Sequence, residues 1–376
     1  MSAIAAINIH PIVVPLRRGH RTAHEPRTEG SLLLVEVRSD DGVTGYGQVT
    51  STPMKEVAYW VERLAETAVG MDARAPAAVW EALFALTSPR VGAGGLPRGA
   101  RPQVMAAIGG IDMALWDLLG KSAGLPVFRL LGAENRPVFV YATGGYYVDG
   151  EKLTACADEL AGFVERGFRA VKLKTGAASI QDEVSRIAAT RKAIGDDIRL
   201  MLDMNAAYDL PACIEFARAV EPFDITWLEE PLHWYLQPAD FVRLAQATPI
   251  PLAHGEREIT RFTTRDFIAS GALRYVQFDA TRYAGWTEAL RVAHLADQHG
   301  VMISPHHAPE LHCHLVAAFP RLGYAVEAHG APEDSDPVWT GLYRDRAQLR
   351  GSHVYMSEKP GFGYEIDWAF VKKHRA

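Results

Sequence analysis

The sequence has few cysteines and no long apolar segment, and these absences exclude several classes of protein. Its 376 residues include three cysteines, Cys156, Cys213 and Cys313, which are odd in number and far apart. Disulfide frameworks need paired cysteines, so we expect reduced thiols in a cytoplasmic protein. No apolar run approaches the roughly 18 residues that span a bilayer. Residues 4–16 lack the basic leader of a signal peptide, so we expect no signal peptide and no membrane association.

The sequence also lacks an excess of positive charge. It has 39 Lys and Arg against 45 Asp and Glu, which gives a net charge of −6. Nucleic acids and anionic membrane surfaces attract basic proteins, so we expect neither as a partner. The hydrophobic fraction of 48% is ordinary for a globular protein with a large core. The length suits one large domain with a smaller unit attached.

From about residue 138 the sequence alternates between short apolar strands and helices. The strands follow one another at intervals of about 30 residues, the spacing of units in a (β/α)8 barrel. We therefore expect an α/β fold with a TIM-like barrel over residues 136–334. An open, doubly wound sheet is the alternative. The expected strands are Val138–Tyr141, Ala170–Lys174, Leu200–Asp203, Ile225–Leu228, Pro251–Ala253, Tyr275–Phe278, Met302–Ser304 and Ala325–Val326.

The residues on either side of this region have a different pattern. Residues 1–135 read as strands followed by helices, which is typical of an α+β unit. Residues 335–376 are mixed and partly extended, and we expect them to pack back on the N-terminal unit. The sequence thus predicts an α+β capping domain over 1–135, completed by 335–376.

Two lysines alternate with apolar residues in Val171-Lys172-Leu173-Lys174. Alternation places Lys172 and Lys174 on one side of a strand. If that side faces a barrel mouth, each ammonium group disfavours the charge of the other and burial adds to the effect. One lysine could then be neutral enough near pH 7 to act as a base. A half-exposed strand with two solvated lysines would give the same pattern.

Acidic residues follow three successive expected strands, and we interpret Asp203, Glu229 and Glu256 as metal ligands. A lone carboxylate at a strand end usually caps a helix, but three that point into one space would repel one another without a cation. Hard oxygen ligands suit Mg²⁺ better than zinc. Strand parity leaves two choices open, Glu229 or Glu230 and Glu256 or Glu258.

Histidines cluster after the seventh expected strand. His306 and Asp279 end consecutive strands, so they could touch, and a carboxylate that orients an imidazole is a common acid–base pair. A zinc site built from His306, His307, His312 and His314 is the alternative. Its spacing matches no compact zinc motif.

The polar segment 17–30, between the first two expected strands, looks like a mobile loop that could cover the barrel mouth. We expect His24 and Arg27 of this loop, together with Tyr146, to bind substrate. Arginine and histidine there fit a second carboxylate or several hydroxyls, although a solvated surface loop explains them almost as well.

Taken together, these landmarks resemble the enolase superfamily, mandelate racemase subgroup, over nearly the whole chain. The motifs that carry the resemblance are Gly110-Ile111-Asp112-Met113-Ala114-Leu115-Trp116-Asp117-Leu118, Lys172-Leu173-Lys174, Asp203-Met204-Asn205, Glu229-Glu230-Pro231, Gly255-Glu256, Asp279, Ser304-Pro305-His306 and Pro360-Gly361-Phe362-Gly363.

The resemblance implies a capped, modified barrel with Mg²⁺ as its cofactor, and it favours Glu229 and Glu256 as the ligands beside Asp203. It implies Lys174 as the base on one face of the substrate and a His306–Asp279 pair on the other. It also implies Lys172 and Asn205 near the substrate carboxylate. Glu327 corresponds to an acid that hydrogen-bonds the enediolate, the intermediate that this superfamily stabilises.

One departure narrows the function. Some relatives carry a second lysine on the sixth strand, where this sequence has Arg282, and arginine is a poor base. That leaves His306 as the second acid or base. The segment Val138–Tyr147 and Gln277-Phe278-Asp279 are similar to tartrate dehydratases of the superfamily.

We therefore expect a Mg²⁺-dependent dehydratase of a hydroxy acid or acid sugar, whose partner is a small-molecule carboxylate. A racemase or epimerase that uses the same two bases is the alternative. A non-catalytic metal-dependent binding protein is less consistent with the complete set of bases and ligands. The family also suggests an even-numbered homo-oligomer.

Overall fold

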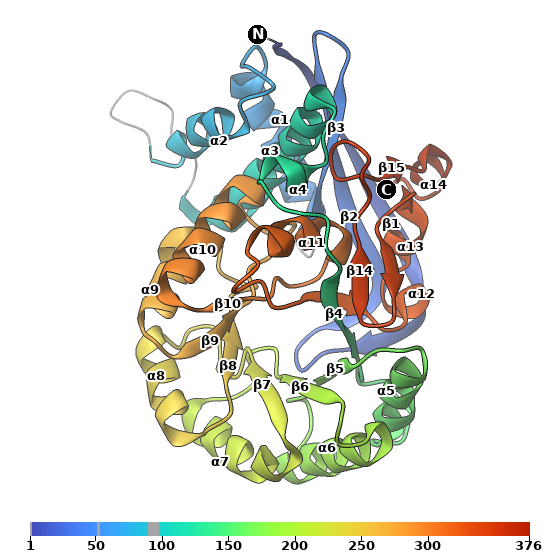
Figure 1. Ribbon diagram of the computed structural model, residues 1–376, viewed down its shortest axis with the longest axis vertical. Coiled ribbons are helices and arrows are strands. Elements are labelled where there is room, and N and C mark those ends of the chain that lie inside the picture. The colour runs from blue at the N-terminus through green and yellow to red at the C-terminus, as the bar shows by residue number, and fades with distance from the viewer. Residues whose placement is uncertain (1, 51–52, 89–97) are drawn as a thin grey trace.

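The computed structural model of this chain describes residues 2–50, 53–88 and 98–376. Its N-terminal part is a three-stranded antiparallel sheet in the order β1-β2-β3. Helix α3 packs against β3 and β2, and α1 and α2 pack against α3 (Figure 1). These elements are β1 (Ile4–Arg21), β2 (Pro26–Ser39), β3 (Thr44–Thr50), α1 (Met54–Ala68), α2 (Pro76–Ala85) and α3 (Arg101–Ala123), followed by the short α4 (Val127–Leu130).

The central part is a parallel sheet whose strands neighbour one another in chain order from β4 to β10, with β11 beside β4. A single parallel bridge, between Ile303 and Gly323, links the β10 end of this sheet to the segment before β11. The strands are β4 (Val138–Gly144), β5 (Ala170–Lys174), β6 (Arg199–Asp203), β7 (Ile225–Glu229), β8 (Leu252–His254), β9 (Leu273–Val276), β10 (Met302–Ile303) and β11 (Val326–His329).

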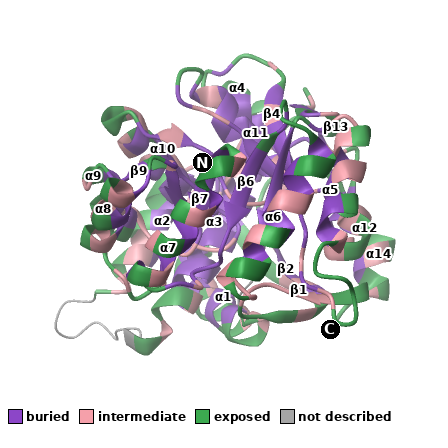
Figure 2. Cartoon of the chain, turned by 90° about the horizontal axis from the view of Figure 1, so that it is seen from below, coloured by how far each residue is buried: buried purple, intermediate pink, exposed green. Residues whose placement is uncertain are grey.

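A helix follows each of the strands from β4 to β10, and these helices lie outside the strands (Figure 1). The helices that follow β4 to β9 expose their outer faces, whereas the helix after β10 and the strands are almost wholly buried (Figure 2). None of the helices in the described part of the chain has the length and apolarity that crossing a bilayer requires. The helices are α5 (Ala155–Glu165), α6 (Ile180–Ile194), α7 (Leu210–Val220), α8 (Pro238–Ala247), α9 (Arg261–Ala269), α10 (Gly285–His299) and α11 (Pro309–Ala318).

A layer of buried side chains inside these strands separates the polar site from the opposite end of the sheet. Tyr141, Trp227 and Tyr275 pack together, and smaller residues, Ala170 and Ala253, fill the positions between them. Because side chains alternate across a strand, the residue two positions further on faces the same interior. This layer is the apolar floor of the site described below.

The segment 17–30 differs from the predicted loop. Its ends continue β1 and β2 as a long hairpin, in which His20 pairs with Arg27 and Arg21 with Pro26, so only residues 22–25 form the turn. The backbones of Arg21 and Tyr147 exchange two hydrogen bonds of 2.9 and 3.0 Å. This pairing satisfies backbone groups that a loop would leave to water, and it fixes the hairpin beside the C-terminal end of β4.

The C-terminal segment returns to both parts of the molecule. β14 pairs with β4, and the Val13 N–H donates to the His374 carbonyl at 3.0 Å.

A second junction joins α3 to α10, where the buried Asp112 accepts hydrogen bonds from the backbone and hydroxyl of Thr287 at 2.7 and 2.6 Å. The C-terminal elements are α12 (Pro332–Ser335), α13 (Pro337–Leu342), β12 (Tyr343–Arg344), β13 (Gln348–Arg350), β14 (His353–Tyr355), β15 (Glu365–Ile366) and α14 (Trp368–Lys373).

Candidate active site

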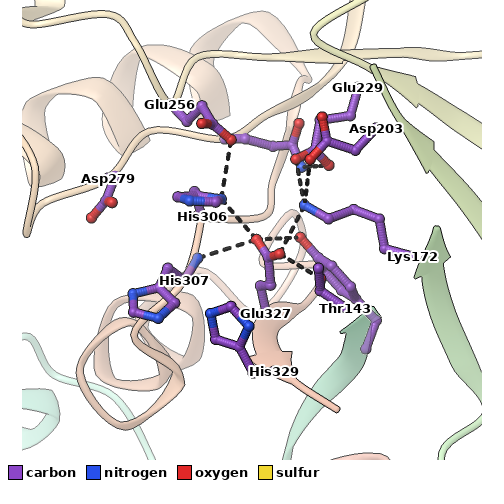
Figure 3. Close-up of polar contacts among 12 residues, drawn as sticks. Thr143, Lys172, Asp203, Glu229, Glu256, Asp279, His306, His307, Glu327 and His329 are labelled. Carbon is purple, nitrogen blue, oxygen red and sulfur yellow. Dashed lines mark hydrogen bonds and ion pairs between the residues drawn. The ribbon is translucent and has the colours of Figure 1, made fainter. Parts of the chain in front are cut away.

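Polar side chains from neighbouring strands converge directly above the apolar floor. Lys174, Asp203 and Glu229 are register partners on β5, β6 and β7, so they lie at one level of the sheet. Lys172 lies two residues before Lys174 and faces the same interior. All four side chains are buried. The predicted convergence of lysines and carboxylates is therefore present (Figure 3).

The lysines and carboxylates form a continuous network of ion pairs. The Lys172 ammonium contacts Glu229, lies 2.8 Å from Glu327 Oε1 and 3.5 Å from Asp203 Oδ2. Lys174 is hydrogen-bonded to Asp203. Glu327, on β11, accepts further hydrogen bonds from Thr143 Oγ1 at 2.5 Å and from the backbone of His307 at 3.2 Å. These contacts hold Glu327 at the centre of the site.

The pairing corrects the expectation that the pKa of one lysine is lowered towards neutrality. Burial disfavours the charged form of Lys174, but the surrounding acidic groups, Asp203 foremost, together outweigh burial and raise the pKa of Lys174. The pKa of Lys172 is raised in the same way, by Glu229 and Glu327 against burial. The sequence placed carboxylates at the ends of the neighbouring strands, but it did not show that they pair with the lysines.

Strand parity left open whether Glu229 or Glu230, and whether Glu256 or Glu258, belongs to the site. In each pair the structure places one of the two glutamates there. Glu229 faces the interior, where Trp227 Nε1 and Gln277 Nε2 donate to its Oε2 at 3.1 and 2.6 Å. Glu230 is also buried, but it pairs with Arg257 at 3.0 Å.

In the segment after β8, Glu256 lines the cavity of the site, and Arg282 Nη1 lies 2.8 Å from its Oε1. The carboxylate of Glu258 instead lies 3.4 Å from His254 Nε2. Glu256 is thus the acidic residue of this pair that the site contains.

The expected contact between His306 and Asp279 is not formed. His306 Nδ1 lies 2.9 Å from Glu327 Oε2 and 3.1 Å from Glu256 Oε2. Asp279 instead accepts two 2.8 Å hydrogen bonds from Thr281, through its backbone N–H and its hydroxyl. Figure 3 shows Asp279 apart from the His306 ring. Consecutive strand ends brought the two residues near each other, but the loop after β9 turns the Asp279 carboxylate back onto its own backbone.

The zinc interpretation of the histidine run is wrong for the described residues. His312 Nε2 accepts a hydrogen bond from the Ala280 backbone, and His314 Nδ1 accepts one from the Phe128 backbone. Both histidines are buried in α11, where they satisfy backbone groups. They do not converge with His306 or His307 on one point.

The donor atoms present fit a divalent cation. Glu229, Glu256 and His306 place one ligand atom each within 4.8 Å of one another. Among the described residues, Asn205 Oδ1 is a buried oxygen without a hydrogen-bond donor, and Glu256 Oε2 has no donor in hydrogen-bonding geometry although His306 Nδ1 lies 3.1 Å away. A cation would satisfy both oxygens. Asp203 lies outside this closest group because its carboxylate is turned to Lys174, yet it is the register neighbour of Glu229.

A cavity of about 250 Å³ opens above these residues. Lys174, Asn205 and Glu256 line it from one side, and Arg27 and Tyr146 line it from the hairpin and from the segment after β4. His24 does not line the cavity. It is exposed, with its ring centroid 5.8 Å from that of Trp234.

Sequence reasoning missed a second polar cluster that also lines the cavity. His307 Nε2 hydrogen-bonds Asp336 Oδ2 at 2.7 Å, and His329 Nε2 lies 3.8 Å from the same oxygen. These residues come from the loop before α11, from β11 and from the turn between α12 and α13. The adjacent pair His306-His307 was the one available signal, since nothing in the sequence linked Asp336 to it.

Comparisons with known proteins support these landmarks. Residues 4–132 match the N-terminal domain of mandelate racemase / muconate lactonizing enzyme, and residues 155–370 match the enolase C-terminal domain-like family. The chain is 31% identical over 346 residues to an L-talarate/galactarate dehydratase of Salmonella typhimurium, covering 91% of this chain and 82% of that protein.

Two further relatives differ in what their names describe. An arabinonate dehydratase of Saccharolobus solfataricus is 28% identical over 341 residues, which cover 89% of this chain and 88% of that protein. A crystal structure of a racemase from Streptomyces coelicolor with bound magnesium has a TM-score of 0.87 and 26% identity. The match covers 99% of this chain and 100% of that one.

Proposed function

Because this chain belongs to the enolase superfamily, in its mandelate racemase / muconate lactonizing enzyme subgroup, we propose that it is a Mg²⁺-dependent hydro-lyase. Its reaction removes the α-proton of a hydroxy-carboxylate and eliminates the β-hydroxyl as water. The resulting enol collapses to a 2-keto acid. The dehydratases among its relatives support this choice of reaction.

Asp203, Glu229 and Glu256 would hold the cation. When bound, Mg²⁺ supplies positive charge that stabilises the enediolate form of the substrate carboxylate and lowers the barrier to removing the α-proton. The unsatisfied buried oxygens of Glu256 and Asn205 support this assignment.

Lys174 is the proposed base. Its ammonium lines the cavity and is held by Asp203, whose charge must be taken up elsewhere before Lys174 can be neutral. Lys172 lies deeper, with no exposed surface, between Glu229 and Glu327. A fully paired and buried ammonium suits the fixed role of stabilising negative charge on the substrate carboxylate.

His306 is the proposed acid that protonates the departing hydroxyl. It enters the cavity from the loop after β10, whereas Lys174 enters from β5, so the two groups approach the substrate from different strands. Glu327 orients His306 through the 2.9 Å contact and faces the position where the enediolate oxygens develop.

The observation that carries this proposal is that Glu256, Lys174 and His306 line one cavity. Asp203, which is hydrogen-bonded to Lys174, and its register neighbour Glu229 are buried next to them. We also propose that the parallel strands close into a barrel over residues 136–334, with residues 1–135 and 335–376 as the cap. The separate family matches for 4–132 and 155–370 support that division.

Racemisation is the second candidate, because one of the related solved structures is that of a racemase. A library of acid sugars and hydroxy acids tests both, with Mg²⁺ and after chelation. Metal-dependent formation of a 2-keto acid with loss of water is the expected result. An inverted α-carbon with unchanged mass would support the racemase, and turnover that survives chelation would end both proposals.

A further inference from the structure

The cavity has a second end, whose residues have no part in the proposed reaction. Four of them, Arg27, His307, His329 and Asp336, are called the distal pole here. Figure 3 shows His307 and His329 on the opposite side of Glu327 from Asp203 and Glu229. A substrate that extends from the catalytic carboxylates past Glu327 therefore reaches these residues.

Arg27 is the unusual member of the distal pole. The other arginines that line the cavity, Arg257 and Arg282, are each paired with a buried carboxylate, Glu230 and Glu256, at 3.0 and 2.8 Å. Within the described ranges, no carboxylate lies within 4.0 Å of the Arg27 guanidinium. A half-buried guanidinium facing a cavity without a counter-ion favours an anionic ligand, because the fork of N–H donors matches a carboxylate.

The remaining residues of the distal pole form no ion pair with Arg27 in the described part of the chain, although against burial His307 and, less strongly, Arg27 hold the pKa of Asp336 below its ordinary value. Asp336 is already occupied by the 2.7 Å hydrogen bond to His307. Burial disfavours the charged imidazole of His307, but this bond to Asp336 raises its pKa above the ordinary value. His329 Nδ1 is buried, and none of the residues that the structure describes hydrogen-bonds it. The distal pole thus offers a guanidinium without an ion pair within 4.0 Å and a ring nitrogen without a hydrogen-bond partner among the described residues.

We infer that the substrate is a dicarboxylate of the aldarate type, an acid sugar with a carboxylate at each end, whose second carboxylate binds Arg27. This inference rests on the proposed function and goes further, because the named relatives include enzymes for both one-carboxylate and two-carboxylate acids. A terminal hydroxymethyl group would leave the guanidinium desolvated and without a counter-ion. Asp336 is a positioning residue, which acts by holding His307 at the distal pole.

Matched substrate pairs provide the test. Each pair shares the configuration at every carbon and differs only at the far end, as galactarate and galactonate do. We expect the protein to prefer the aldarate of its best pair by roughly 10²-fold in kcat/KM, the range for one lost charged hydrogen-bonding group.

Variants assign that preference to the distal pole. Arg27→Met should lower kcat/KM for the aldarate by roughly 10- to 10²-fold, mainly through KM, and change the aldonate by less than about threefold. Arg27→Lys keeps the charge and should fall between Arg27→Met and the unaltered protein. Asp336→Asn should reduce the aldarate preference by several-fold. The exposed Arg17 does not line the cavity, so Arg17→Met is the matched control for losing one positive charge and should leave the ratio unchanged.

The two ideas fail differently. If aldonates are dehydrated better than their matched aldarates, or if Arg27→Met lowers both equally, the inference is wrong while the proposed function stands. If no member of any pair loses water, the proposed function itself is wrong.

Discussion

The two ends of the cavity are built on different principles. The catalytic end takes Lys172, Lys174, Asp203 and Glu229 from neighbouring parallel strands, and each of them is buried and paired. The distal pole takes its residues from a hairpin, a loop, a strand end and a turn. There the Arg27 guanidinium has no carboxylate within 4.0 Å in the described part of the chain, although Asp336 belongs to the same cluster.

We infer from this difference that the catalytic end carries out the reaction and that the distal pole selects the substrate. Strand neighbours cannot move independently, so the catalytic groups keep one geometry whichever substrate enters. Connecting segments tolerate substitution. Changes in them can therefore alter which group is accepted at the far end of the substrate without disturbing proton transfer. The comparison predicts that variants at the catalytic end abolish turnover, whereas variants at the distal pole change which acid is turned over.

The largest expected effect is at the carboxylates of the catalytic end. Glu256→Gln should lower kcat by on the order of 10³-fold or more, because a lost cation removes the stabilisation of the enediolate. Metal content and kcat are the measurements. Glu258→Gln is the matched control, since Glu258 contacts His254 and should cost little activity. Equal losses in the two variants would contradict the assignment of Glu256.

A smaller effect, on the pH dependence of stability, is expected where α3 packs against α10. Burial raises the pKa of Asp112 to about 7, although its hydrogen bonds from Thr287 oppose the shift. The folded state therefore binds more protons than the unfolded state between about pH 4 and 7, and stability must fall as pH rises through this window. We expect a decrease on the order of 2–4 kcal/mol in the free energy of unfolding.

Urea unfolding at several pH values measures this decrease. Asp112→Asn removes the titrating group and keeps its shape, so the variant should lose that pH dependence. An unchanged slope in the variant would assign the pH dependence to other groups and leave the Asp112 junction without a role in it.

The catalytic end was largely predictable from the sequence, because its residues follow from the periodicity within one strand and from the regular spacing of successive strands. The period of two placed Lys172 and Lys174 on one face, and regular strand spacing placed Asp203, Glu229 and Glu256 at neighbouring strand ends. The pKa of Lys174 was not predictable in this way, since it depends on the register that brings Asp203 beside it.

The distal pole could not be predicted, because it depends on contacts between distant segments. His307, His329 and Asp336 meet only after α11 and α12 have packed, and Arg27 reaches the cavity only because segment 17–30 is a paired hairpin. His306 illustrates the same limit, since its neighbours are Glu256 and Glu327 and not the expected Asp279. The cytoplasmic location and the even-numbered oligomer stay predictions.

The smallest expected effect is at His24. Its side chain is exposed and does not line the cavity, in contrast to Arg27 three residues later. His24→Ala should therefore change kcat/KM by less than about threefold, in the range of a surface substitution. A loss of kcat/KM as large as that of Arg27→Met would show that other residues of the hairpin also contribute to substrate binding and that the distal pole includes more than the four named residues.

The most direct test of the account follows the α-proton of the best substrate by NMR in deuterated buffer. His306→Asn should still exchange this proton through Lys174 while forming 2-keto acid 10²–10⁴-fold more slowly, the typical range for one lost acid or base. Lys174→Ala should lose exchange and dehydration together, and Lys192→Ala, an exposed lysine on α6, should lose neither. Dehydration by Lys174→Ala at the unaltered rate would contradict the central claim that Lys174 is the base.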